Sequence, residues 1–108
     1  MKCVFCNLKN HEVIFETKNY IFLKDKFPVV EGHSLLIPKN HVRKESELPE
    51  GFKECSDRAW KWVEDNYSEP VTFVHPPKLQ DVFHYHRHFI PSKTYKRGLI
   101  VRLLKEEK

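Results

Sequence analysis

Three histidines that alternate with other residues constrain the fold of this chain more than any other feature. His84, His86 and His88 stand two positions apart, among aromatic residues and Arg87. In a β-strand, residues two apart lie on one face, about 6.6 Å from each other at a rise of about 3.3 Å per residue. The pattern therefore predicts a strand over Asp81–Pro91, with the three histidines on one face and aromatic side chains with Arg87 on the other.

The rest of the chain favours strands and one long helix. Apolar and β-branched runs predict strands over residues 12–16, 20–24, 33–38 and 71–74, and an edge strand over 98–104. Residues 50–67 are the helix candidate, because apolar side chains recur there at helical spacing: Phe52, Cys55, Ala59, Trp62 and Val63. The sequence thus predicts the α+β class with a mainly antiparallel sheet.

Size and composition exclude several classes of protein. The length of 108 residues fits one domain over residues 1–108. The mean hydropathy is −0.61, and no apolar run approaches the roughly 20 residues of a transmembrane helix. The glycines, at positions 32, 51 and 98, cannot form a dinucleotide-binding or P-loop motif. We expect no signal peptide and a cytoplasmic protein, because the N-terminus lacks an apolar segment. A net charge of +4 favours anionic partners.

The cysteines point to a metal site more than to disulfides. Cys3 and Cys6 form a C-x-x-C pair, and Cys55 lies in the predicted helix. An odd number of cysteines without a signal peptide argues against a disulfide framework. A C-x-x-C pair is typical of a redox site or of half a zinc site, and the absence of a preceding strand favours zinc, with histidines as the other ligands. We expect Cys55 to pack as a small apolar side chain.

The histidine segment is open to two chemical interpretations. In the first, His84, His86 and His88 all face one metal ion, as in a catalytic zinc site. In the second, they divide the work, so that one is a metal ligand, one a nucleophile, and one an orienting group or donor. The C-x-x-C pair favours the second interpretation, because it already needs histidines as additional zinc ligands.

Two separated motifs resemble the histidine triad (HIT) family. The family carries Gly-His-x-Leu-φ-Ile-Pro-Lys-x-His, matched here by residues 32–41, and His-φ-His-φ-His-φ-φ after Gly-Gln, matched by Gln80–Pro91. The resemblance covers the chain in order from Cys3 to Pro91 and includes Phe22–Asp25. It implies a five-stranded antiparallel sheet with a helix packed on it, and a homodimer.

The resemblance implies a catalytic role for three histidines. His86 would attack the α-phosphorus of a purine nucleotide derivative and form a nucleotidyl-histidine intermediate, which water would then hydrolyse. His88 would support the phosphate site, and His33 would lie behind the triad in a hydrogen-bonded chain. Neutral imidazole, with an ordinary pKa of about 6.5, is a competent nucleophile once its tautomer is fixed. The expected enzyme is a nucleotide hydrolase or nucleotidyl transferase acting on a phosphoramidate, a nucleotidyl adduct or a dinucleoside polyphosphate.

The resemblance also implies a nucleotide-binding set and a zinc set. Asp25 would hold the ribose hydroxyls, and an apolar slot would take the purine: Val4, Phe5, Leu8 and Leu23. Gln80 and Asp81 fall where the family contacts the phosphate and the leaving group. In zinc-containing members, the residues matching Cys3, Cys6, His41 and His84 bind a structural zinc ion.

Three departures from the family pattern keep alternatives open. Arg87 stands at a position that is normally apolar, Asp81 stands where many relatives carry Ser or Thr, and the usual Asn-x-Gly loop before Gln80 is missing. One alternative is a non-catalytic nucleotide- or partner-binding protein on the same fold. The other is a small zinc-dependent nucleic-acid-binding module, which the basic charge permits but no stripe of basic and aromatic residues supports. His11 and His75 match no motif position, and we predict no function for them.

Overall fold

The protein, seen in a computed structural model, is built on one antiparallel sheet. The structure describes residues 11–75 and 84–92. Five strands pair in the order β1-β2-β3-β5-β4, and every pairing is antiparallel. Their bounds are β1 Val13–Glu16, β2 Tyr20–Lys24, β3 Ser34–Pro38, β4 Pro70–Phe73 and β5 Arg87–Pro91. The predicted fold class is confirmed.

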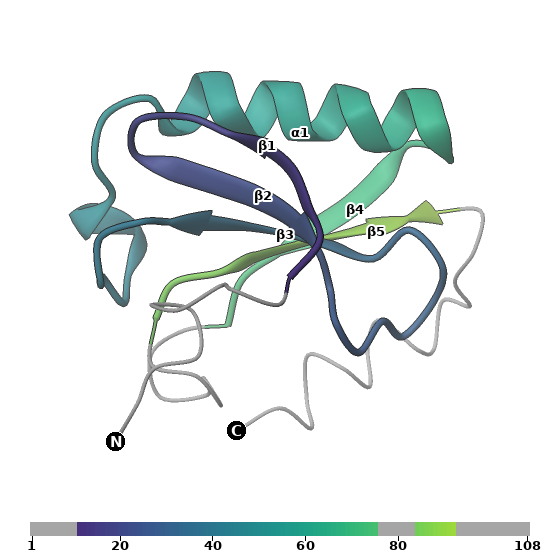
Figure 1. The fold of residues 1–108 in the computed structure, drawn as a ribbon, viewed down its shortest axis with the longest axis horizontal. Coiled ribbons are helices and arrows are strands. Elements are labelled where there is room, and N and C mark those ends of the chain that lie inside the picture. The colour runs from purple at the N-terminus through teal and green to yellow at the C-terminus, as the bar shows by residue number, and fades with distance from the viewer. Residues whose placement is uncertain (1–10, 76–83, 93–108) are drawn as a thin grey trace.

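The long helix α1 (Phe52–Asn66) lies across one face of this sheet (Figure 1). It begins after Gly51, whose positive φ of 95° is a conformation that glycine adopts at little cost. The predicted apolar stripe faces the sheet, and its members Cys55, Ala59 and Val63 are buried. They pack against strand residues of the main core, which include Phe15, Tyr20, Phe22, Leu36 and Phe89. As predicted, Cys55 packs as a small core side chain.

The opposite face of the sheet carries the histidines. Leu35 of β3 pairs with His88, and the next residue, Leu36, pairs with Arg87. Leu36 belongs to the core under α1, so Arg87 lies on the helix side and His88 on the other side. Leu35 packs there in a second cluster with Ile21, Leu23 and Ile37. The prediction that Arg87 points away from the histidine face is confirmed.

The histidine strand begins later than the sequence predicted. Strand β5 starts at Arg87, so His84 and His86 precede the ladder that pairs β5 with β3 and β4. The expected strand over 81–91 is therefore wrong for residues 84–86, and residues 81–83 and the expected edge strand over 98–104 lie outside the described residues. Within residues 11–75 and 84–92, no helix combines the length and the apolar character needed to cross a membrane.

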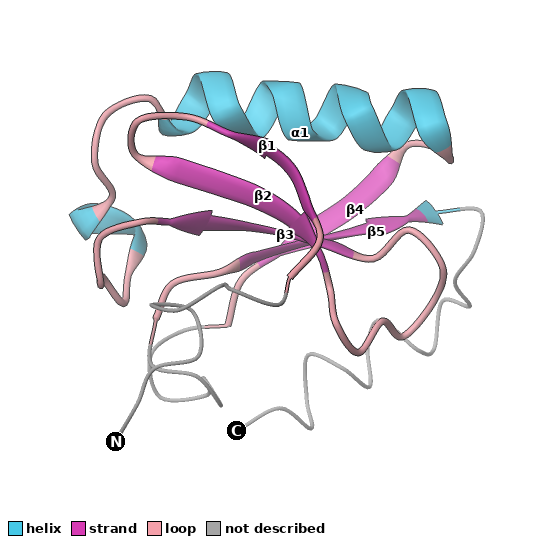
Figure 2. Cartoon of the chain, in the orientation of Figure 1, coloured by secondary structure: helices cyan, strands magenta, loops and turns pink. Residues whose placement is uncertain are grey.

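The connections at the two ends of β3 frame the site. The β2–β3 connection holds Asp25 and ends at His33, whose N–H donates to the Val30 carbonyl at 3.2 Å. After β3, the chain passes His41 and forms a short 3₁₀ helix, η2 (Glu45–Glu47), before α1. Figure 2 shows these two connections at opposite ends of β3.

Candidate active site

His33 links the backbone of the β2–β3 connection to the third histidine of the triad. The Val29 N–H donates to His33 Nδ1 at 3.3 Å, so the neutral ring carries its proton on Nε2. His33 Nε2 lies 2.9 Å from His88 Nδ1, which therefore accepts the hydrogen bond. These contacts assign a tautomer to each ring in turn, and they place the proton of neutral His88 on Nε2.

His88 presents a buried hydrogen-bond donor. Its Nε2 has no partner among the described residues. The ring is covered by Phe73, stacked at 4.8 Å between centroids, and by His75, edge-on at 5.4 Å. Burial, and to a smaller extent three neighbouring histidines, lower the pKa of His88 to about 2. The ring therefore stays neutral and offers an N–H suited to a phosphoryl oxygen.

His86 is held in the tautomer that a nucleophile requires. Its Nδ1 lies 2.8 Å from the backbone carbonyl oxygen of His84. A carbonyl oxygen only accepts, so Nδ1 carries the proton and the lone pair lies on Nε2. The His86 ring centroid is 5.1 Å from that of His88. A nucleophilic nitrogen and a neutral N–H donor thus come from adjacent rings on one face.

His84 and His41 form a pair with the chemistry of metal ligands. The Nε2–H of His84 donates to the Pro38 carbonyl at 2.8 Å, which leaves the lone pair on Nδ1. The His41 ring lies 4.8 Å from the His84 ring between centroids. Burial lowers the pKa of His84, and neutral imidazole is the form that binds Zn²⁺. These two residues therefore fit the predicted zinc set, while Cys3 and Cys6 lie outside the described residues.

A second group, Asp25, His33 and His88, also brings metal-ligand atoms within 4.8 Å of one another. Asp25 Oδ2 is 3.2 Å from His33 Nε2, and Asp25 Oδ1 accepts the Phe27 N–H at 2.8 Å. His33 Nδ1 already accepts the Val29 N–H, so His33 Nε2 carries a proton and has no lone pair for a metal. We interpret this group as a hydrogen-bonded chain, and the histidines as dividing the work rather than sharing one metal.

The structure describes only part of the predicted nucleotide-binding set. We call the hydrogen-bonded pair of His33 and His88 the relay. Asp25 lies beside it, in contact with His33. Leu23 is fully buried and packs in the second apolar cluster. Its contact with a base stays a prediction. The other members of the set lie outside the described residues: Val4, Phe5, Leu8, Gln80 and Asp81.

Two histidines without a predicted function lie near the site. His75 is buried and packs edge-on against both His88 and Phe73. His11 lines a cavity of about 270 Å³ together with Asp25, Lys24 and Lys26. Motif positions could not reveal either residue. For His75 the available signal was its place two residues after Phe73, because Phe73 pairs with His88 across the sheet.

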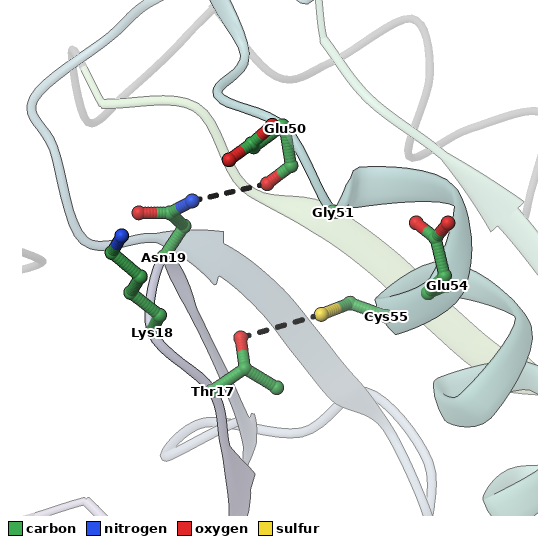
Figure 3. Close-up of a pocket in the computed structure, with 7 residues that line it drawn as sticks. All are labelled: Thr17, Lys18, Asn19, Glu50, Gly51, Glu54 and Cys55. Carbon is green, nitrogen blue, oxygen red and sulfur yellow. Dashed lines mark hydrogen bonds between the residues drawn. The ribbon is translucent and has the colours of Figure 1, made fainter.

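A larger cavity, of about 500 Å³, lies away from the triad (Figure 3). It opens between the β1–β2 turn and the start of α1. Its lining in the described part of the chain contains no histidine: Thr17, Lys18, Asn19, Glu50, Gly51, Glu54 and Cys55. Cys55 Sγ contacts Thr17 Oγ1 at 3.4 Å, and Asn19 donates to the Glu50 carbonyl at 3.1 Å. This cavity therefore brings together none of the histidines of the candidate site that the structure describes.

Comparison with known proteins gives the same family as the motifs. The model of the HIT domain family matches residues 8–95. An adenosine 5′-monophosphoramidase from Saccharomyces cerevisiae is 36% identical over 111 aligned residues, which cover 92% of this chain and 68% of that protein.

Solved structures show the same fold. A zinc-bound histidine triad family protein from Mycobacterium smegmatis superposes with a TM-score of 0.73 at 24% identity, covering 100% of this chain and 81% of that one. A HIT family hydrolase from Clostridium thermocellum superposes with a TM-score of 0.71 at 27% identity, covering 83% of this chain and 90% of that one. With the family match extending over most of its length, this chain belongs to the HIT domain family.

Proposed function

We propose that this protein hydrolyses a purine nucleotide derivative at its α-phosphate, through a covalent intermediate on His86. The observation that carries the proposal is the pair of fixed tautomers. His86 holds its lone pair on Nε2, and the adjacent His88 holds a proton on a buried Nε2 that has no partner among the described residues. The first atom can attack phosphorus, and the second can bond a phosphoryl oxygen.

The reaction would proceed in two displacements. In the first, the lone pair of His86 Nε2 forms a bond to phosphorus while the bond to the leaving group breaks, and the leaving group takes the electron pair and a proton from solvent. In the second, water attacks phosphorus, the phosphorus–nitrogen bond breaks, and the electron pair returns to Nε2. The water proton passes to solvent. Throughout, the His84 carbonyl keeps the proton of His86 on Nδ1.

The relay of His33 would hold the donor in place. Negative charge grows on the phosphoryl oxygens as phosphorus becomes five-coordinate, and the Nε2–H of His88 would stabilise it. Because His33 donates a hydrogen bond to Nδ1 of His88, the proton of His88 stays on its Nε2. Asp25, bonded to the same relay, would also hold the ribose hydroxyls of the nucleotide.

Zinc would serve this protein as a structural ion. His41 and His84 would hold it with Cys3 and Cys6. Such a closed set of four ligands leaves no position for a catalytic water, so the ion would tie the N-terminal segment to the histidine segment. The Mycobacterium smegmatis relative of similar fold is a zinc-bound protein.

The yeast relative suggests the first substrate to test. That protein is an adenosine 5′-monophosphoramidase, so AMP release from adenosine 5′-phosphoramidate should be compared between wild type, His86→Ala and the surface control Asp57→Asn. We expect release by wild type and by the control, and a loss on the order of 10³-fold or more in His86→Ala.

A trapping experiment tests the intermediate itself. Rapid denaturation of wild type during turnover should yield protein with one nucleotidyl group bound to His86, and none in His86→Ala. Equal AMP release by wild type and His86→Ala, with both proteins folded, would exclude the mechanism. Tight nucleotide binding without turnover of any of the three substrate classes would favour the non-catalytic alternative.

A further inference from the structure

The nucleophile lies just outside the backbone ladder of its own strand. The pairing of β3 with β5 ends at Arg87, which is opposite Leu36. His86 is the next residue toward the N-terminus and lies just outside β5. Catalysis by a positioned nucleophile requires placement to a fraction of an ångström, because a misplacement of about 1 Å can cost about 10²-fold in rate. The contacts of the two residues that flank His86, Tyr85 and Arg87, therefore bear on where its ring lies.

Those contacts converge on one carboxylate. The Tyr85 hydroxyl donates to Glu45 Oε1 at 2.9 Å. The Arg87 guanidinium reaches both carboxylate oxygens of Glu45, at 3.2 and 3.3 Å. The two residues that flank the nucleophile in sequence are thus both bound to η2, on the helix side of the sheet.

Each hydrogen bond between Arg87, Tyr85 and Glu45 has a defined donor and acceptor. Arg87 Nε donates to the Tyr85 hydroxyl oxygen at 3.2 Å, and that hydroxyl donates onward to Glu45. Arg87 also donates to Thr72 Oγ1 of β4 at 3.4 Å, and its guanidinium lies 5.7 Å above the Phe52 ring. The position of Arg87 is therefore set from several sides.

The same carboxylate belongs to the connection that carries His41. Glu45 lies in η2, four residues after His41, and the Tyr85 N–H donates to the Val42 carbonyl at 2.6 Å. One backbone bond and one shared carboxylate thus attach this connection to the histidine segment.

We propose that Glu45, acting through Tyr85 and Arg87, is a positioning residue that holds His86 in register for attack. The inference rests on the proposed function of His86, and it adds the residues that hold the two neighbours of His86 in place. Arg87, which departs from the usual apolar pattern, is the cation of this clamp. We call Glu45, Tyr85 and Arg87 the clamp.

The exposure of the clamp side chains predicts that the clamp affects activity more than folding stability. The Glu45 side chain is 57% exposed and that of Arg87 only 17%. An ion pair with one exposed partner contributes little to folding. Its directional bonds to two residues around the nucleophile can nevertheless fix geometry, so activity should respond more than melting temperature.

The test uses Glu45→Gln, Arg87→Met and the double variant, with Asp57→Asn as a matched control. Asp57 pairs with Lys53 at 2.8 Å on the exposed face of α1, so the control removes an ion pair that does not touch the site. We expect each single clamp variant to lower kcat by roughly 10- to 100-fold with KM within about twofold. The double variant should lose no more than the worse single variant, because both changes break one unit.

A spectroscopic readout does not depend on knowing the substrate. Imidazole ¹⁵N shifts report which nitrogen of His86 is protonated. Wild type and Asp57→Asn should show the Nδ1–H form, and Glu45→Gln should show a mixture of both forms as the bond to the His84 carbonyl loosens. An unchanged His86 tautomer in Glu45→Gln would overturn the proposal, as would an unchanged kcat. If wild type turned over no substrate, the proposed function would fail while the ¹⁵N spectra still decided on the clamp.

Discussion

The two ends of the histidine segment are held in different ways. At one end, His88 lies within the ladder between β3 and β4 and is bonded to His33. At the other end, His84 and His86 precede the ladder and are held by side chains and by single carbonyl groups. The first end we call the relay end, and the second the clamp end.

This difference separates two requirements of one reaction. The relay end fixes where a donor lies and which nitrogen carries its proton, and strand pairing makes that arrangement rigid. The clamp end carries the proposed nucleophile and the proposed metal-ligand pair, and a few directional contacts hold it in place. Perturbations at the two ends should therefore have different signatures, which the following experiments test in order of expected size.

The largest effect should follow from removing the relay histidine. His33→Leu keeps the volume but removes both ring nitrogens, which leaves the Val29 N–H and His88 Nδ1 without their partner. We expect kcat to fall roughly 10²-fold and unfolding free energy to fall by about 1–3 kcal/mol, because the buried Nδ1 of His88 loses its hydrogen bond. Steady-state kinetics and urea unfolding measure both. A variant as active as wild type would show that the relay does not orient His88.

Metal removal should act on the clamp end alone. If zinc is bound by Cys3, Cys6, His41 and His84, a strong chelator should lower the melting temperature by roughly 10 °C. His41→Ala should start at the lower value and be insensitive to the chelator, whereas His33→Leu should remain sensitive. Calorimetry with metal analysis decides. A melting temperature that no chelator changes in metal-analysed wild type would argue against a structural zinc ion.

A matched pair of glycines compares packing at the relay end with open space elsewhere. Gly32, directly before His33, has a φ of 92°, and a Cβ there would lie 2.7 Å from Pro91 Cγ. Gly51 has a φ of 95° and nothing within 4 Å of the same position. Gly51→Ala should cost about 1 kcal/mol from backbone strain alone, and Gly32→Ala about 1–2 kcal/mol more. If both substitutions lowered the unfolding free energy equally in urea unfolding, Pro91 would be able to move away from a Cβ at position 32 without loss of stability.

At about pH 6 the smallest effect should be the loss of stability caused by any one buried imidazole. Burial lowers the pKa of His33 and of His88 in the folded protein, whereas in the unfolded chain both stay near 6.5. Below pH 6.5 the unfolded chain therefore binds protons that the folded chain does not. Stability is unaffected above that pH and falls below it, by up to about 1.4 kcal/mol per pH unit for each ring.

The control for this pH effect is His88→Gln, which removes the more strongly shifted of the two rings. Measured by urea unfolding between about pH 7 and about pH 5, the unfolding free energy of this variant should change with pH by an amount that corresponds to one proton fewer than in wild type. An identical slope in both proteins would mean that groups other than His88 bind the protons that unfolding takes up.

Much of the fold was predictable from periodicity. Apolar and β-branched runs located β1 to β4 to within a residue or two, and the stripe through Cys55, Ala59 and Val63 located α1. Alternation also assigned the histidines and Arg87 to opposite faces. It could not locate the start of β5, because an extended segment alternates in the same way whether or not it pairs with a neighbour.

The contacts that complete the site could not be read from the sequence. The relay joins His33 to His88 across 55 residues, and the clamp joins Glu45 to Arg87 across 42. Glutamates are frequent in this chain, and nothing in the local pattern distinguishes Glu45. His75 matches no motif, yet the pairing of Phe73 with His88 brings the His75 ring against that of His88. Long-range pairing, rather than local propensity, decides such contacts.

The hydrogen bond from Val29 to His33 makes one backbone amide a natural reporter of the relay. This N–H exchanges with solvent slowly only while His33 Nδ1 accepts it. A second proton, on His33 Nδ1, would place two N–H donors face to face. The hydrogen bond would then break and the Val29 amide would exchange faster. Phe27, two residues away and 82% exposed, is attached to Asp25 through its own N–H, so the outer edge of this connection is coupled to the relay. Amide exchange at a single surface position therefore reads the protonation state of a buried chain.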